Sequence, residues 1–114
     1  MTTSSVSPVT TELAGSETGI TLVIHAGAGS RGKHSTPERI AQVELDLQRA
    51  LDAGYQLLES GAPAHEAVVA AIHDMEDAPE FNAGRGAALT SDGIAQMDAC
   101  LMTGDGEVGA VTGV

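Results

Sequence analysis

Aromatic side chains are nearly absent from this sequence, which has one Phe, one Tyr and no Trp in 114 residues. Much of its apolar content is alanine, so large side chains that could fill a core are scarce. A chain of this length forms at most one domain, and small domains have little apolar surface to spare. We therefore expect a single domain with a thin core.

Basic residues are also few, with five Lys and Arg against sixteen Asp and Glu and a formal net charge of −11. Such a surface repels nucleic acid and anionic membranes, so we expect neither as a partner. No apolar run approaches the length of a membrane span. The single cysteine, Cys100, excludes an internal disulfide and fits a reducing compartment, which predicts a cytoplasmic protein.

Residues 1–19 lack the basic and apolar regions of a secretory signal, and their Ser and Thr content predicts a flexible N-terminal tail. The folded part is then residues 20–114. It opens with Ile20–Ile24, an apolar and β-branched run that predicts a buried strand.

Two helices are expected next. Thr36 is a suitable N-cap, Pro37 suits the first helical position, and apolar residues at helical spacing continue until Gly61. Pro63 opens a second helix, which Pro79 closes. Because very few residues join the two helices, they should pack as an antiparallel pair.

A glycine-rich loop that runs into residues 87–90 follows, and then strands separated by glycine-containing turns. Residues 94–102 and 108–114 are the two apolar segments predicted to form these strands. The last of them ends at Val114 inside an apolar run, whereas finished domains usually end in polar, exposed residues. We therefore expect this sequence to be the first part of a longer protein.

The stretch "GAGSRGK", residues 27–33, contains the glycine spacings of both a dinucleotide-binding and a phosphate-binding loop. A phosphate loop needs a helix that starts directly after its last glycine, and here the helix starts only at Pro37. His34 also occupies the position where a magnesium-binding Ser or Thr would follow the lysine. A nucleotide-binding function is therefore the weaker alternative, and a tight bend after a strand explains the first glycines.

Three stretches together resemble the plant-type L-asparaginase, or isoaspartyl peptidase, family of N-terminal-nucleophile hydrolases. They are "VIHAGAG", "FNAGRGAALTSDG" and "MDACLMTGDGEVGAVTGV", and the resemblance covers residues 20–114. It implies an α/β (α+β) protein: part of a four-layer αββα sandwich that lacks the later strands and helices. It also implies a precursor that cleaves itself and forms a dimer of α/β heterodimers. The substrates would be L-asparagine and β-aspartyl dipeptides, hydrolysed by an N-terminal threonine through an acyl-enzyme.

Residue by residue, His25, Ala26 and Gly27 fall on a family loop that is strained and supports self-cleavage. The family usually has glycine where this chain has Ala26, and a glycine-only backbone there would cost alanine about 1–3 kcal/mol. Asn82 falls on a supporting asparagine beside the nucleophile. No organic cofactor is implied, but a structural sodium ion is, held by the backbone carbonyls of a loop. Its residues here are Glu76, Phe81, Ala83 and Arg85.

The nucleophilic threonine of the family would lie beyond Val114, so this chain alone is expected to be inactive. The other hypothesis from a different class is a non-catalytic module that only assembles with other subunits.

The remaining candidates have simpler explanations. Cys100 is expected to be a core thiol, and His65 and His73 should be exposed helix residues without a metal. His25 is expected to fix its loop by a hydrogen bond rather than to act as a base. Asp98 should be partly buried and serve as a hydrogen-bond acceptor. Four carboxylates of the first helix should mostly decorate a solvated face, and they are Glu44, Asp46, Asp52 and Glu59.

Overall fold

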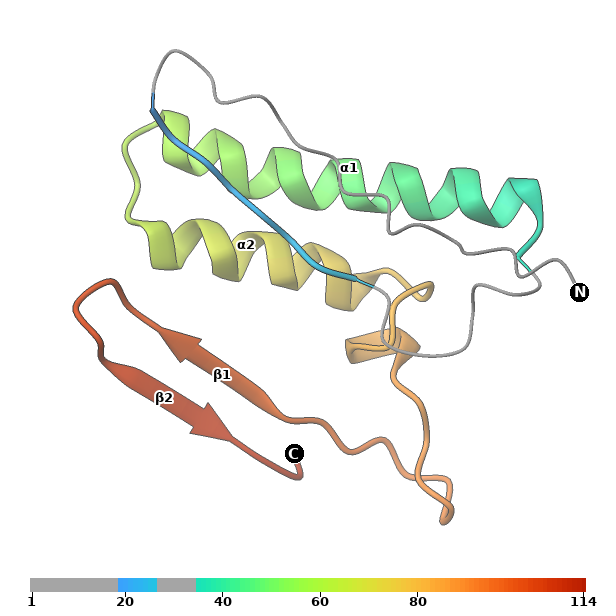
Figure 1. The fold of residues 1–114 in the computed structure, drawn as a ribbon. Coiled ribbons are helices and arrows are strands. Elements are labelled where there is room, and N and C mark those ends of the chain that lie inside the picture. The colour runs from blue at the N-terminus through green and yellow to red at the C-terminus, as the bar shows by residue number, and fades with distance from the viewer. Residues whose placement is uncertain (1–18, 27–34) are drawn as a thin grey trace, which may run out of the picture.

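The computed structural model describes residues 19–26 and 35–114. The predicted tail, except its last residue, and the GAGSRGK loop lie outside these ranges. Two α-helices come first, α1 (Pro37–Glu59) and α2 (Ala64–Asp77), followed by the short 3-10 helix η2 (Gly84–Gly86). Two strands, β1 (Ala99–Met102) and β2 (Val108–Val111), complete the order. The helices lie antiparallel and side by side, as predicted, with the strands on the other side of α2 (Figure 1).

Both ends of α1 confirm the boundaries read from the sequence. The Thr36 hydroxyl accepts a hydrogen bond from the Arg39 amide at 3.2 Å, and proline occupies the first turn. At the other end Gly61 adopts φ +87°, and its amide donates to the Leu58 carbonyl at 3.0 Å. This left-handed residue satisfies a carbonyl that the last helical turn leaves open. The helix therefore starts and stops where local chemistry dictates.

The first described segment, residues 19–26, is extended but is not hydrogen-bonded into a sheet, contrary to the prediction of a buried strand. It crosses the pair of helices (Figure 1, blue), and no strand within the described ranges pairs with it. Its side chains alternate: Leu22 is 8% exposed, whereas Val23 is 81% exposed. Ile20, Ile24 and Ala26 share the inward face with Leu22 and are partly buried. The expected fully buried strand is thus half-buried, because the helices cover only one of its faces.

The core is thin, as the composition predicted. A buried cluster joins α1 to α2 and to the segment after it, and contains Ala50, Met75, Ala78 and Phe81. Four partly buried residues pack against this cluster, and they are Ile24, Ala26, Val43 and Leu47. No large side chain among the described residues is fully buried. Small residues instead let backbones approach: a Cβ on Gly54 would lie 2.7 Å from Leu22 Cδ2 and 2.8 Å from the Ala67 carbonyl oxygen.

The strands are shorter than predicted. β1 and β2 pair antiparallel, with Ala99 opposite Val111 and Met102 opposite Val108. Residues 87–90 form only one bridge, between Leu89 and Ala95.

Beyond β2 the register changes by one residue. Met97 and Val114 exchange two backbone hydrogen bonds, of 2.9 and 3.1 Å. Thr112 and Gly113 therefore lie together opposite Asp98, which is a β-bulge, and Gly113 has φ +66°. The bulge is what ends the regular ladder before the predicted end of the strand.

Every residue of β1 and β2 is exposed. The prediction that Cys100 is a core thiol is therefore wrong for this chain, since its thiol is free and exposed. A groove of about 770 Å³ separates the hairpin from α2, with Val69 and Ile72 of α2 on one side and Leu101 and Val111 of the strands on the other. The described residues thus form one helical layer and a two-stranded sheet, and the four-layer sandwich stays an expectation.

Candidate functional site

The two candidate regions share one buried cluster. Ala26, at the end of the first segment, packs against the cluster to which Phe81 belongs. Asn82 follows Phe81 directly. His25 is exposed on the opposite side of the first segment, and Gly27 lies outside the described residues. The geometry therefore places the Ala26 side chain, rather than the His25 side chain, toward the core.

Ala26 is not held in a glycine-only conformation. Within the described ranges, no residue other than glycine has a positive φ. The strain that the resemblance implies at this position is therefore absent from the Ala26 backbone, and so is its energetic cost. The methyl group of Ala26 instead adds an apolar contact to the core.

Asn82 closes its own loop. Its side-chain oxygen Oδ1 accepts a hydrogen bond from the Ala88 amide at 2.8 Å, across the η2 turn. Side chains of this type commonly hold turns by bonding nearby backbone amides. The Asn82 side chain is itself exposed, so it remains accessible from outside while its oxygen is fixed.

Carbonyl groups crowd the glycines of this loop. A Cβ on Gly86 would collide with the carbonyl oxygens of Phe81 and Pro79, and one on Gly84 would collide with the carbonyl of Glu76. The Ala83 carbonyl accepts the Gly86 amide at 3.1 Å. Several backbone oxygens therefore converge where only glycine leaves room, which is the donor set that a hard cation prefers.

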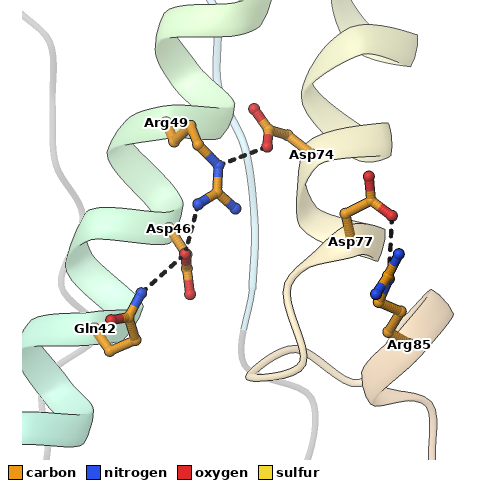
Figure 2. A network of polar contacts seen from close by, with 6 residues as sticks. All are labelled: Gln42, Asp46, Arg49, Asp74, Asp77 and Arg85. Carbon is orange, nitrogen blue, oxygen red and sulfur yellow. Dashed lines mark hydrogen bonds and ion pairs between the residues drawn. The ribbon is translucent and has the colours of Figure 1, made fainter.

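Two ion pairs brace the same loop. The Arg85 guanidinium lies 3.4 Å from the Asp77 carboxylate at the end of α2 (Figure 2). The Arg39 guanidinium, from the first turn of α1, lies 2.9 Å from the Glu80 carboxylate. Arg39 and Glu80 are far apart in the sequence, and no sequence pattern pointed to their pairing. Together the pairs join the ends of both helices to the 79–86 segment.

A second polar network joins α1 to α2 (Figure 2). Arg49 Nε lies 2.7 Å from the Asp74 carboxylate, and its Nη1 lies 3.1 Å from Asp46. The hydrogen bond that Arg49 donates to the Asp74 carboxylate raises the pKa of Arg49 above its ordinary value. Asp46 also accepts from Gln42 at 3.2 Å. The prediction that Asp46 decorates a solvated face is wrong: it is 3% exposed, because it lies on the face of α1 that meets α2.

Asp98 holds the β-bulge. Its Oδ1 accepts from the Thr112 hydroxyl at 2.5 Å and from the Gly113 amide at 3.0 Å. These two bonds, the hydroxyl first, lower the pKa of Asp98 because they favour the ionised form. The expected hydrogen-bonding role is therefore confirmed, but the expected burial is not, since Asp98 is exposed.

Few other side chains among the described residues are candidates for binding or catalysis. His65 and His73 are exposed on α2, as predicted. Across residues 19–26 and 35–114, no three His, Cys, Asp or Glu side chains come close enough together to hold a metal ion. Neither helix within those ranges has the length and apolar character required to cross a membrane.

Known proteins resemble this chain over most of its length. Residues 18–114 match the model of the family described as "Asparaginase". The chain belongs to the asparaginase family. The match takes in both candidate loops and the β-hairpin, which confirms the plant-type L-asparaginase and isoaspartyl peptidase resemblance.

Several relatives within this family share about two fifths of the aligned residues. A plant-type L-asparaginase of Pyrococcus abyssi is 43% identical over 96 residues, which are 83% of this chain and 30% of that protein. An isoaspartyl peptidase/L-asparaginase of Bos taurus is 39% identical over 94 residues, which are 82% and 30% of the two chains. An isoaspartyl peptidase of Escherichia coli is 38% identical over 96 residues, again 82% and 30%. The chain thus spans about 30% of the length of these relatives.

Proposed function

We propose that this chain supplies the supporting loops of an asparaginase and isoaspartyl peptidase, whose threonine nucleophile lies outside it. The support is that Ala26 packs against the buried cluster that includes Phe81, within the region matched by the family. The relatives are named for hydrolysis of L-asparagine or isoaspartyl peptides. The proposed substrates are therefore L-asparagine and β-aspartyl dipeptides.

The proposed reaction is amide hydrolysis in two steps. A threonine hydroxyl attacks the side-chain carbonyl of the substrate, the C–N bond breaks, and ammonia or an amino acid leaves with the proton. Water then hydrolyses the ester, which restores the hydroxyl and releases aspartate. In this scheme Asn82 is a supporting group. Its side-chain oxygen accepts a hydrogen bond from the Ala88 amide, which fixes the orientation of the Asn82 side chain.

The 76–86 loop is proposed to hold a structural sodium ion through backbone carbonyls. Glu76 and Phe81 of the expected ligand set provide two of the crowded carbonyls, and Pro79 provides a third that the sequence did not suggest. The Ala83 carbonyl is already engaged by Gly86 and would contribute a second lone pair. The positive charge of Arg85 is balanced by Asp77, which makes a nearby cation less unfavourable.

A chimera tests the proposed function. The matched segment of the Pyrococcus abyssi relative would be replaced by residues 18–114 of this chain, and ammonia release from L-asparagine would be measured. We expect hydrolysis by the chimera and none by this chain alone. Asn82→Ala should reduce the activity at least about tenfold, the usual scale for loss of a group that supports the transition state.

Gln56→Ala, on the exposed side of α1, is the matched control and should leave the activity of the chimera unchanged. A chimera that folds and self-cleaves but hydrolyses neither asparagine nor a β-aspartyl dipeptide would refute the proposal.

The exposed hairpin favours a second candidate, a non-catalytic module that assembles with other subunits. All eight residues of β1 and β2 are exposed, and strand edges of this kind readily pair with other chains. This candidate predicts that the chain binds its partner subunits while the chimera stays inactive.

A further inference from the structure

We propose that Ala26 is a positioning residue, whose methyl group docks the end of the first described segment onto the buried cluster that includes Phe81 and thereby steadies the 81–88 loop. The inference rests on the proposed function for its significance, but its test does not depend on hydrolysis. It concerns one atom, the Cβ of Ala26, where that segment packs against the cluster.

The Ala26 side chain points toward the helices. Exposure alternates strictly along residues 20–26, so Ala26 is the last of four inward-facing positions, after Ile20, Leu22 and Ile24. Its backbone has no positive φ, which means that an ordinary extended conformation carries the methyl group inward. Alanine at this position therefore suits the packing and does not require a strained backbone.

The Ala26 methyl group packs against buried apolar residues. Ala26 packs against the cluster in which Phe81 is 6% exposed and Ala78 is 2% exposed. Phe81 is the only aromatic ring in this cluster. The backbone of residue 82 begins where the Phe81 backbone ends, so fixing Phe81 fixes the start of the Asn82 loop.

Polar contacts hold the chain on both sides of Phe81. Asn82 Oδ1 accepts the Ala88 amide, and Glu80 is held by Arg39 on the other side of Phe81. The loop is thus fixed at the residue before Phe81 and at the residue after it. Ala26 adds a third constraint, through its packing against the cluster that includes Phe81.

Hydrogen exchange of the 114-residue chain, read by mass spectrometry, tests this inference. We expect Ala26→Gly to speed exchange in the peptide covering residues 81–90 by roughly two- to fivefold, the effect of losing one buried methyl group and some backbone rigidity. Exchange in the peptide covering residues 99–111 of the hairpin, which contributes no residue to this cluster, should not change. Ala26→Ser keeps the Cβ and should restore the wild-type rate in the loop.

Asn82→Ala serves as the positive control, because it removes the acceptor of the Ala88 amide directly. In a Phe81→Leu background, Ala26→Gly should have a smaller effect than in the wild type, since the shared contact is already reduced. An unchanged loop, an equal increase in the hairpin, or an Ala26→Ser variant as fast as Ala26→Gly would each overturn the inference. Failure of the chimera to hydrolyse asparagine would leave this result unaffected, so the two proposals fail separately.

Discussion

Arg49 on α1 and Asp74 on α2 form a 2.7 Å ion pair, and the same guanidinium also reaches the buried carboxylate of Asp46. One exposed cation therefore compensates a carboxylate that is 3% exposed. We expect Arg49→Met to lower the urea midpoint of unfolding, measured by circular dichroism at a helical wavelength, because Asp46 would lose its cation but stay buried. Gln56→Ala is the control.

Adding Asp46→Asn to Arg49→Met should recover part of that loss, since the uncompensated charge is then removed. Strictly additive effects would show that Asp46 does not depend on Arg49.

Gly54→Ala tests the close approach of α1, α2 and the first segment. The new Cβ would lie 2.7 Å from Leu22 Cδ2 and 2.8 Å from the Ala67 carbonyl oxygen. Although alanine favours a helix, overpacking should dominate and lower the free energy of unfolding by about 1–3 kcal/mol. Gly104→Ala, which meets nothing within 4 Å, is the matched control and should be nearly neutral. A more stable Gly54→Ala variant would contradict the packing described here.

The β-bulge should respond to acid. The Thr112 hydroxyl and the Gly113 amide lower the pKa of Asp98 below its ordinary value of 3.8. A lowered folded pKa means that the stabilisation is complete above the unfolded pKa and is lost as the pH falls through the folded one. We therefore expect the amide resonance of Gly113 to shift with a midpoint below pH 3.8. Asp98→Asn should abolish the transition, and Thr112→Val should raise its midpoint. A wild-type midpoint at or above the ordinary value would refute the role assigned to these bonds.

The carbonyl-lined loop should bind sodium weakly and specifically. We expect the 23Na resonance to broaden in the presence of the chain. Potassium and choline, added as competitors, should reverse this broadening to different extents. Gly86→Ala should remove the effect, because its Cβ would occupy the space between the Pro79 and Phe81 carbonyls. Arg85→Ala should preserve or strengthen it, since a neighbouring positive charge is lost. Broadening that persists in Gly86→Ala would place the ion elsewhere.

Local chemistry made part of this structure predictable. Thr36, Pro37 and Gly61 set the ends of α1 by caps whose partners lie within a few residues. The role of Asp98 as an acceptor was also accessible, because an aspartate among apolar neighbours needs donors. The position of Asn82 on a glycine-rich loop came from the family resemblance and agrees with its turn-forming bond to Ala88.

Features that depend on distant partners were not predictable in the same way. Apolar patterns indicated buried strands for Ile20–Ile24 and around Cys100, but burial also requires a second layer on the other face. Asp46 could have been found, because it shares a helical face with Val43 and Ala50 at spacings of three and four residues. The Arg39–Glu80 pair had no such signal, since nothing in the sequence aligns those two positions.

The helical pair has a consequence for biosynthesis. Residues 60–63 alone connect α1 to α2, and the cluster around Phe81 closes with no residue from the hairpin. Contacts between neighbouring parts of a chain form quickly, and a nascent protein emerges from its amino end. We therefore expect the helical pair to form first as the chain emerges, so that the strands, which emerge later, meet a surface that is already in place.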